Sequence, residues 1–269
     1  MELRKIDSAA NKKIKLVSSL KQRKYRDREG LFFVEGVRLS EMAADSGWEI
    51  PFGLYTGGLR REGRGMALLE RLGGRGCLLY EVSEEIFAKA SATETPQGIL
   101  LVMKQKRNSL ERFVFRESSL WMILDGIQDP GNAGTMIRTA DAAGLDGVIL
   151  LEGSVDVFGD KTVRATMGSL FHLSIYTEVR RERFLEFARE RKLTLYAAAL
   201  DPTAQAYHRT DFTGNVAVIF GNEANGVSKE LLDAAHKLYI PMYGKAESLN
   251  AASAAAIVVY EAIRQRKDR

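Results

Sequence analysis

The second half of the chain alternates apolar runs with helix-like runs, and this alternation limits the possible folds more than any other feature of the sequence. The apolar runs are typical of buried strands and lie at 121–124, 147–151, 193–199, 216–220 and 238–242. The helix-like runs lie at 131–143, 161–170, 181–191, 228–236 and 249–266. Strands that alternate with helices predict an α/β fold with a mainly parallel sheet that helices cover on both faces.

The first hundred residues predict a smaller, separate α/β domain. Strands are expected at 31–34, 51–56, 77–82 and 98–103, and helices at 11–28, 36–46, 66–72 and 83–90. Ser83 stands where a helix N-cap is expected, and the Gly- and Arg-rich stretch 57–65 is expected to be a loop. A polar, basic stretch follows at 104–109. We therefore divide the chain into a first domain at 1–104, a linker at 105–118 and a second domain at 119–269.

Composition restricts the class of protein. The length of 269 residues is enough for two cores, and 45% hydrophobic with 28% charged residues is typical of a soluble globular protein. The longest apolar stretch, 251–260, is about half of a membrane span, and the first residues lack the apolar region of a secretory signal. The single cysteine, Cys77, fits a reducing cytoplasm and is expected to be structural rather than catalytic. The three histidines lack metal-ligand spacing, so we expect no metal site.

Positive charge is concentrated in the first half. Residues 1–108 hold 20 Lys and Arg against 14 Asp and Glu, a net charge of +6, whereas residues 109–269 hold 19 against 21, a net charge of −2. Such a basic segment beside a near-neutral domain is typical of contact with a nucleic-acid phosphate backbone. A solvated helix whose lysines serve solubility fits the same charges equally well.

Three polar loops in the second half predict one composite ligand site. They are Asn132-Ala-Gly-Thr-Met-Ile-Arg138, Gly221-Asn-Glu-Ala-Asn-Gly226 and Ser248-Leu-Asn250. Each places small, amide or hydroxyl residues where a strand should end and a helix begin. Ligands of open α/β sheets bind there, because backbone N–H groups and helix N-termini converge at that edge.

The class of ligand follows in part from patterns that the sequence lacks. No G-x-G-x-x-G follows a strand, and no G-x-x-x-x-G-K-[ST] occurs. This favours a nucleoside-like cofactor without a diphosphate, such as adenosylmethionine. Residue spacing alone also allows purely structural roles: a surface ion pair for Arg138, charge complementarity at a helix N-terminus for Glu223, and helix capping for Ser248 and Asn250.

The motifs resemble those of one enzyme family. The segments 124–140, 161–169, 219–227 and 239–242 with 248–253 are similar to the three ordered motifs of the SpoU/TrmH family of RNA ribose methyltransferases, in the SPOUT superfamily. This resemblance covers residues 119–266. The segments 15–20, 33–38 and 95–99 resemble the substrate-binding domain of rRNA-directed members, a small α/β module of a type also found in ribosomal proteins.

The resemblance implies a fold and an activity. It implies methyl transfer from S-adenosyl-L-methionine to a ribose 2′-hydroxyl of RNA, without a metal, by a homodimer. It also implies a C-terminal trefoil knot that forms the cofactor site, although general rules of chain connection argue against knots. The Ala-rich segment 251–256 within the last helix is expected to allow close approach of a second subunit.

By the same resemblance, individual residues acquire roles. Arg138 is implied as the catalytic arginine. Residues that shape the site around it are Asn132, Glu223, Ser248 and Asn250. Residues expected to contact the cofactor are Gly221, Ile240, Met242, Leu249 and Asn250. Residues expected to contact RNA are Lys12, Lys15, Arg23, Arg138, Lys161 and Arg164. Because a guanidinium is almost always protonated, Arg138 is either a base of strongly lowered pKa or an electrostatic group.

Four functions are compatible with these motifs. A 2′-O-methyltransferase of large-subunit (23S) rRNA is the leading interpretation. The same chemistry on tRNA is the nearest alternative, although tRNA-directed members typically carry only short terminal extensions. A catalytically silent RNA-binding or ribosome-assembly factor belongs to a different class. A methyltransferase that protects ribosomes from an antibiotic shares the chemistry and differs in biological setting.

Overall fold

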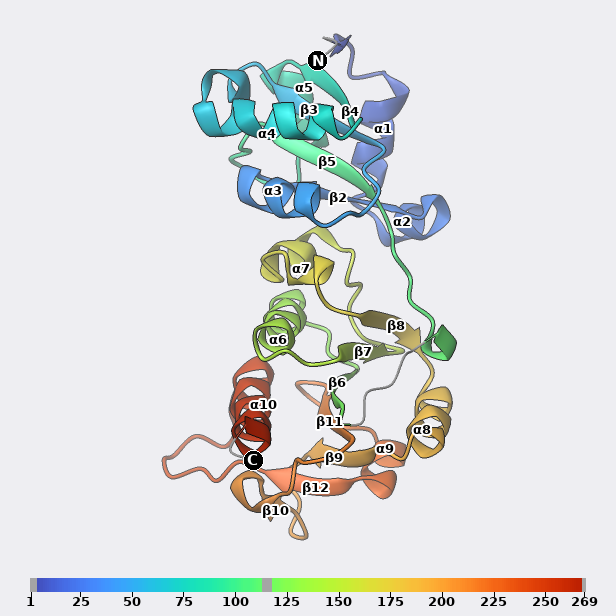
Figure 1. Cartoon of the computed structure of the whole chain (residues 1–269), viewed down its shortest axis with the longest axis vertical. Coiled ribbons are helices and arrows are strands. Elements are labelled where there is room, and N and C mark those ends of the chain that lie inside the picture. Colours follow the sequence, from blue (N-terminus) through green and yellow to red (C-terminus); the bar gives the residue numbers. More distant parts are fainter. Residues whose placement is uncertain (1–3, 113–117, 268–269) are drawn as a thin grey trace. The chain divides into compact units, whose positions relative to one another are not determined.

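The computed structural model describes residues 4–112 and 118–267, which form two compact units (Figure 1). The first unit combines the chain up to Lys106 with Phe158–Phe171, and the second combines Arg107–Val157 with the chain from His172 onward. Part of the expected linker, 113–117, lies outside the described residues, and Leu110–Arg112 form a 3-10 helix. No helix within the described ranges is long and apolar enough to cross a membrane.

The first unit is built on a mixed five-stranded sheet. Its strands are β1 (Arg4–Ile6), β2 (Leu31–Glu35), β3 (Phe52–Thr56), β4 (Leu78–Val82) and β5 (Ile99–Lys104), in the order β1-β4-β3-β5-β2. Strand β5 runs antiparallel to β2 and β3, whereas β1, β4 and β3 are mutually parallel. The four expected strands are confirmed, and β1, which has only three residues, was not predicted.

The helices of the first unit are α1 (Lys12–Ser19), α2 (Arg23–Glu29), α3 (Val37–Asp45), α4 (Gly63–Gly74), α5 (Glu84–Ala90) and α7 (Asp160–Ala165). The prediction of one helix over 11–28 is wrong, because the helix is interrupted between Ser19 and Arg23 and forms two helices, α1 and α2. The guanidinium of Arg26 donates to the carbonyls of Leu20 and Lys21, at 2.7 and 2.9 Å. It thereby satisfies backbone groups that the break leaves without helical partners.

Smaller predictions in this unit meet different outcomes. Ser83 is confirmed as the N-cap of α5, since its hydroxyl accepts the amide of Ile86 at 3.3 Å. The expected loop over 57–65 is wrong in part, because Leu59–Arg61 form a 3-10 turn and α4 already begins at Gly63. Burial raises the pKa of Cys77 to about 11, so this residue is a neutral thiol at pH 7.

The second unit contains a seven-stranded sheet that is parallel throughout. Its strands are β6 (Leu120–Asp125), β7 (Gly147–Leu151), β8 (Ile175–Val179), β9 (Thr194–Ala198), β10 (Gln205–Ala206), β11 (Val216–Gly221) and β12 (His236–Tyr239), in the order β10-β12-β9-β11-β6-β7-β8. Each pairing is parallel. The predicted parallel α/β sheet is therefore confirmed.

Helices cover both faces of this sheet. They are α6 (Pro130–Ala142), α8 (Arg181–Glu190), α9 (Lys229–Ala234) and α10 (Ala251–Lys267). Figure 1 places α6 and α10 on one side of the sheet and α8 and α9 on the other. Trp121 and Ile123 of β6 share a core cluster with Phe184 and Phe187 of α8. Because side chains alternate along a strand, the intervening residues of β6 face the opposite layer.

The sheet edges differ from the prediction. Strands β8 and β10 were not predicted; β10 has only two residues, and β8 is half exposed. The predicted strand over 238–242 is wrong at its end, because β12 stops at Tyr239, and Pro241 has no N–H to donate to a ladder. The predicted helix over 161–170 is also wrong, since α7 ends at Ala165. The chain then turns through positive φ at Met167 (50°) and Gly168 (92°).

Candidate active site

The three polar loops of the second unit meet in a chain of side-chain hydrogen bonds. The amide of Asn132, in the first turn of α6, donates to Glu223 Oε1 at 2.9 Å. The amide of Asn250, just before α10, donates to Asn132 Oδ1 at 2.8 Å. Residues that lie 91 and 118 positions apart are thus joined directly. The prediction that these loops lie together is confirmed.

The ionisation state of Glu223 determines which group donates and which accepts in these side-chain hydrogen bonds. Burial raises the pKa of its carboxyl, but hydrogen bonds from the Asn132 side chain and from backbone amides, including those of Gln128 and Asp129, lower it by more, so the pKa lies below its ordinary value. At neutral pH the carboxylate therefore only accepts hydrogen bonds. Asn132 consequently presents its NH2 group to Glu223 and its carbonyl oxygen to Asn250.

Asn250 connects this chain to the start of the last helix. Its Oδ1 accepts the backbone amides of Ala252 and Ser253, at 2.9 and 3.2 Å. Helix capping by Asn250, one of the alternatives left open by spacing, is therefore present. The same side chain caps α10 with its oxygen and binds Asn132 with its nitrogen, so the two roles coexist. Ser248 lies two residues earlier and is exposed.

Arg138 lies in α6 with its side chain exposed. Among residues 4–112 and 118–267, no carboxylate forms an ion pair with it, and no hydrogen bond of its guanidinium is found. The surface ion pair that spacing allowed is thus not formed with any described residue. All five N–H donors of this guanidinium are available to a ligand.

A pocket of about 720 Å³ lies beside these residues. It is formed by the ends of β9, β11 and β12 together with the segments that follow them. The five residues expected to contact the cofactor all line it: Gly221, Ile240, Met242, Leu249 and Asn250. Glu223 and Ser248 line it as well. This volume lies in the range of about 300–1,000 Å³ that is usual for small-molecule and cofactor sites.

Gly221 is required by the shape of the loop that borders the pocket. A Cβ atom at this position would lie 2.1 Å from the backbone carbon of Gly226 and from the nitrogen of Val227. Asn222 holds the same loop, since its Nδ2 donates to the carbonyl of Gly126 at 2.8 Å and its Oδ1 accepts the amide of Ala224 at 2.9 Å. The backbone of this loop therefore lines the pocket without side-chain bulk at Gly221.

Two residues that support the site were missed by sequence reasoning. Asp125, at the end of β6, is 2% exposed and accepts the backbone amide of Ser228 at 2.7 Å. Arg181, at the start of α8, donates to the same carboxylate at 2.8 Å. A carboxylate directly after an apolar strand was the available signal. Sequence reasoning also missed that Ala198, Ala199 and Leu200, at the end of a predicted apolar strand, form one wall of the pocket.

The residues expected to contact RNA fall in both units. Lys12, Lys15 and Arg23 are exposed on α1 and α2 of the first unit. Lys161 and Arg164 lie on α7 and belong to the first unit as well. Arg138 is the member of this set that belongs to the second unit. Within the described ranges, no cluster of His, Cys, Asp and Glu suited to a metal ion is found.

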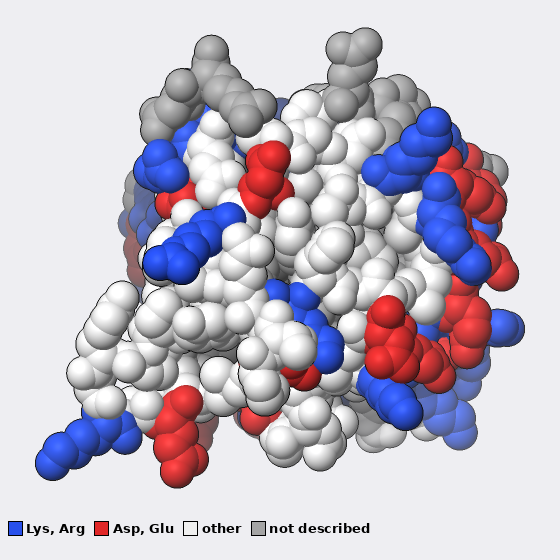
Figure 2. All heavy atoms as spheres, turned by 90° about the horizontal axis from the view of Figure 1, so that it is seen from below, with Lys and Arg blue, Asp and Glu red and all other residues white. Residues whose placement is uncertain are grey.

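Uncharged surface is extensive on the second unit. Viewed from below, the molecule shows a broad uncharged area with charged side chains gathered around it (Figure 2). Large apolar side chains are exposed in this unit, among them Leu200 (74%), Tyr243 (94%) and Tyr260 (51%). A contiguous patch of such side chains, rather than single exposed ones, is what marks a site of association.

Comparison with known proteins finds a matching family for each half of the chain. The SpoU rRNA Methylase family matches residues 119–260, and the MRM3-like substrate binding domain matches residues 11–101. The chain is 38% identical over 263 residues to the 23S rRNA (guanosine(2553)-2′-O)-methyltransferase RlmP of Bacillus subtilis (strain 168), covering 96% of this chain and 98% of that protein.

Solved structures resemble the whole chain. The AdoMet-bound rRNA methyltransferase from Sinorhizobium meliloti is 33% identical with a TM-score of 0.88, covering 97% of this chain and 98% of that one. The SpoU methyltransferase AviRb from Streptomyces viridochromogenes, in complex with AdoMet, is 29% identical with a TM-score of 0.85, covering 96% and 100%.

Proposed function

Because this chain belongs to the SpoU rRNA methylase family, we propose that it transfers the methyl group of S-adenosyl-L-methionine to a ribose 2′-hydroxyl of large-subunit (23S) rRNA. The observation that carries the proposal is the hydrogen-bonded series Glu223–Asn132–Asn250. Its two end members line the pocket, and its middle member lies on α6, the helix that carries Arg138. The series therefore ties the expected catalytic helix to the expected cofactor pocket.

The substrate class follows from the relatives and from the first unit. RlmP is named for a guanosine of 23S rRNA, and residues 11–101 match a substrate binding domain. We propose that residues 1–104 bind the RNA, that 105–118 link the domains and that 119–269 hold the catalytic domain. In this view Lys12, Lys15 and Arg23 contact phosphates, as do Lys161 and Arg164.

The pocket fits the cofactor. Its volume suits a ligand of nucleoside size, and Gly221 leaves its backbone uncovered by a side chain. We propose that Gly221, Ile240, Met242, Leu249 and Asn250 hold adenosylmethionine through backbone groups and an apolar wall. When bound, the cofactor supplies an electrophilic methyl group.

Arg138 is the proposed catalytic residue. A guanidinium with no described partner can donate hydrogen bonds to the ribose oxygen or to an adjacent phosphate. As the 2′-hydroxyl releases its proton to solvent water, the fixed positive charge stabilises the developing alkoxide. Asn132 is held in one orientation by ionised Glu223, and together with Ser248 and Asn250 it shapes the space around the reacting hydroxyl.

Family membership also supports three further proposals. We propose that the C-terminal part forms a trefoil knot around the cofactor site. We propose a homodimer through the catalytic domain, in which α10 approaches the second subunit; the small residues of α10 and its exposed Ile257 and Tyr260 support this. We propose that the enzyme works in the cytoplasm, where its rRNA substrate is made and assembled.

The deciding experiment is transfer of radiolabelled methyl from adenosylmethionine to unmodified large-subunit rRNA and, separately, to bulk tRNA. Label in rRNA that depends on Arg138 and maps to an alkali-resistant ribose is the expected result. Label in tRNA alone would overturn the proposed substrate. Absence of label and of adenosylmethionine binding in folded protein would favour a catalytically silent RNA-binding or assembly factor.

A further inference from the structure

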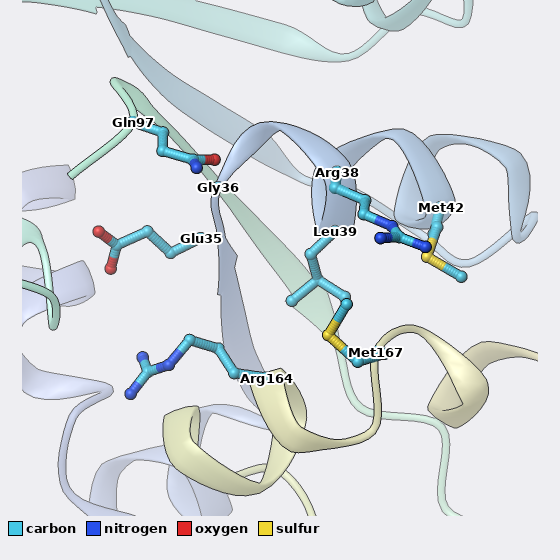
Figure 3. A pocket seen from close by; sticks show the side chains of 8 residues that line it. All are labelled: Glu35, Gly36, Arg38, Leu39, Met42, Gln97, Arg164 and Met167. Atoms are coloured by element: carbon cyan, nitrogen blue, oxygen red, sulfur yellow. The ribbon is translucent and has the colours of Figure 1, made fainter. Parts of the chain in front are cut away.

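A second pocket lies within the first unit, apart from the residues of the proposed cofactor site. It has a volume of about 170 Å³ and lies between α3 and the segment that follows α7. Its lining residues are Glu35, Gly36, Arg38, Leu39, Met42, Gln97, Arg164 and Met167. In Figure 3 Leu39 and Met167 lie at the centre with Arg38 beside them on α3, and the guanidinium of Arg164 points away from them. An apolar centre beside the cation of Arg38 distinguishes this pocket.

The guanidinium of Arg38 retains its donors for a ligand, whereas that of Arg164 is ion-paired. Arg38 is exposed, and its guanidinium forms no ion pair or hydrogen bond with any other residue that the structure describes. Arg164 Nη1 lies 3.0 Å from a carboxylate oxygen of Asp160 but forms no hydrogen bond of acceptable geometry. Gln97 Oε1 accepts the amide of Val37 at 2.9 Å, which leaves the Gln97 NH2 group to donate elsewhere.

The single carboxylate among the lining residues does not compete for an anion. Glu35 is 7% exposed and accepts hydrogen bonds from the hydroxyls of Ser91 and Thr93 and from the amide of Ala92. In Figure 3 its carboxylate points away from Leu39 and Met167. The carboxylate of Glu35 therefore does not face a ligand that lies beside Leu39 and Met167.

The apolar wall is held in an uncommon backbone conformation. Met167 has a φ of 50° and is 38% exposed. Non-glycine residues rarely adopt positive φ, and such strain is often kept at binding sites. The following Gly168 has a φ of 92°, and a Cβ there would lie 2.2 Å from Cε of Met42. Gly168 thus lets the segment after α7 pack against α3.

From these observations we infer that the pocket binds one unstacked nucleotide of the RNA substrate. The base lies against Leu39, Met42 and Met167, and a phosphate next to it is bound by Arg38. Proteins read single-stranded RNA by stacking splayed bases on flat side chains and by holding the backbone with cations; in this pocket the apolar side chains of Leu39, Met42 and Met167 take the place of the stacking platform. The inference rests on the proposed function in that RNA is taken to be the substrate.

The first test does not depend on methyl transfer. The full-length protein carries ¹³C-methyl methionine, and nucleoside 3′,5′-bisphosphates of the four bases are added as small ligands with a phosphate on each side. The signals of Met42 and Met167, assigned by Met→Leu substitution, are expected to shift, while those of Met122 and Met136, buried in the second unit, stay in place. Arg38→Gln should abolish the shifts. No shift with any of the four bases would overturn the inference.

The second test measures binding to an rRNA fragment that the wild-type protein methylates. Arg38→Gln and Met167→Asn are expected to weaken binding about 5- to 20-fold, whereas Lys104→Gln, which removes an exposed charge at the far end of β5, should change it less than about twofold. Since Asn tolerates positive φ, Met167→Asn should keep or raise the Tm, which separates lost binding from lost folding. Equal binding by all three variants would contradict the pocket.

The two proposals can fail separately. Methyl transfer by the wild-type protein without shifts at Met42 and Met167 would retain the enzyme activity and remove the nucleotide pocket. Shifts at both methionines without methyl transfer would retain the pocket and remove the activity.

Discussion

The side-chain amide of Asn250 donates to the side-chain carbonyl of Asn132 across 2.8 Å and ties the last helix of the chain to α6. Since Asn132 is bound in turn by Glu223, three loops share one network whose donors and acceptors alternate without conflict. A network of this kind orients its members more strongly than separate pairs would.

The coupling between the two asparagines can be measured by a double-mutant cycle. Asn132→Ala and Asn250→Ala are each expected to destabilise the protein by about 1 kcal/mol, and the double variant by less than their sum, with a coupling of about 0.5–1 kcal/mol. Asn250→Ala also removes the cap of α10. Chemical denaturation of the four proteins provides the comparison, and strictly additive effects would show that the hydrogen bond is absent in solution.

Removal of the Arg138 guanidinium should affect chemistry rather than folding. Arg138→Ala is expected to lower kcat about 100- to 1,000-fold, with unchanged Tm and unchanged affinity for adenosylmethionine, because its side chain is exposed and has no described partner. The matched control is Arg189→Ala, another exposed arginine of the second unit. Activity of Arg138→Ala near that of the control would remove this residue from the mechanism.

Replacement of Glu223 by glutamine should have an effect that depends on pH. The folded protein holds the pKa of Glu223 below its ordinary value, so the carboxylate stabilises the fold above the unfolded pKa of about 4.3. The free energy of unfolding of the wild-type protein should exceed that of Glu223→Gln by about 1 kcal/mol at pH 7. The difference should shrink as the pH falls from about 4.3 through the lower folded value. Denaturation series between pH 3 and pH 7 are the measurement, and a difference independent of pH would contradict this assignment.

Gly221 and Gly214 offer a matched pair of substitutions. Gly221→Ala forces a Cβ to 2.1 Å from the backbone of Gly226. This substitution should lower the free energy of unfolding by about 1–3 kcal/mol. It should also weaken adenosylmethionine binding by more than tenfold, because the loop at the pocket has to move. At Gly214 no atom lies within 4 Å of an added Cβ. Although φ there is 76°, Gly214→Asn should cost less than about 1 kcal/mol and leave binding unchanged. Isothermal titration of both variants decides the matter.

The proposed homodimer is testable by mass. Light scattering at micromolar concentration should give twice the chain mass of 29.9 kDa. Introduction of charge on α10, in the double variant Ile257→Asp and Tyr260→Asp, should yield a monomer with retained secondary structure. A monomeric wild-type protein would contradict the proposal.

Much of the second unit followed from its sequence, for physical reasons. Buried parallel strands are continuous apolar runs, and helices between them carry polar caps, so β6, β7, β9 and β11 were predicted near their true positions. The edge strands β8 and β10 were not, because a short or half-exposed strand has little apolar signal. The break between α1 and α2 depends on Arg26, whose bonds to Leu20 and Lys21 cannot be inferred from helical spacing.

The candidate site was predicted in part. Polar loops at strand ends indicated which segments meet, and Asn132, Glu223 and Asn250 are joined in the structure. Asp125 and Arg181 were missed because their role depends on an ion pair between distant segments, in which the carboxylate is buried and the guanidinium is partly exposed. The pocket in the first unit was missed because it needs α3 and the segment after α7, which lie more than a hundred residues apart, to fold into the same unit.

The place of Phe158–Phe171 has a consequence for how such an enzyme can be divided or recombined. The chain passes between the two units three times: once after Lys106, once before Phe158 and once after Phe171. A single cut in the segment 105–118 would therefore not separate the units cleanly, because Phe158–Phe171 of the first unit would stay covalently attached to the second. A gene fusion that exchanged the first hundred residues would also have to supply a partner surface for Phe158 and Phe171, which lie against Phe32 and Trp48. The first unit is therefore completed by a segment that the chain supplies only after it has begun the second, and replacing the first hundred residues alone would not exchange it as a separate module.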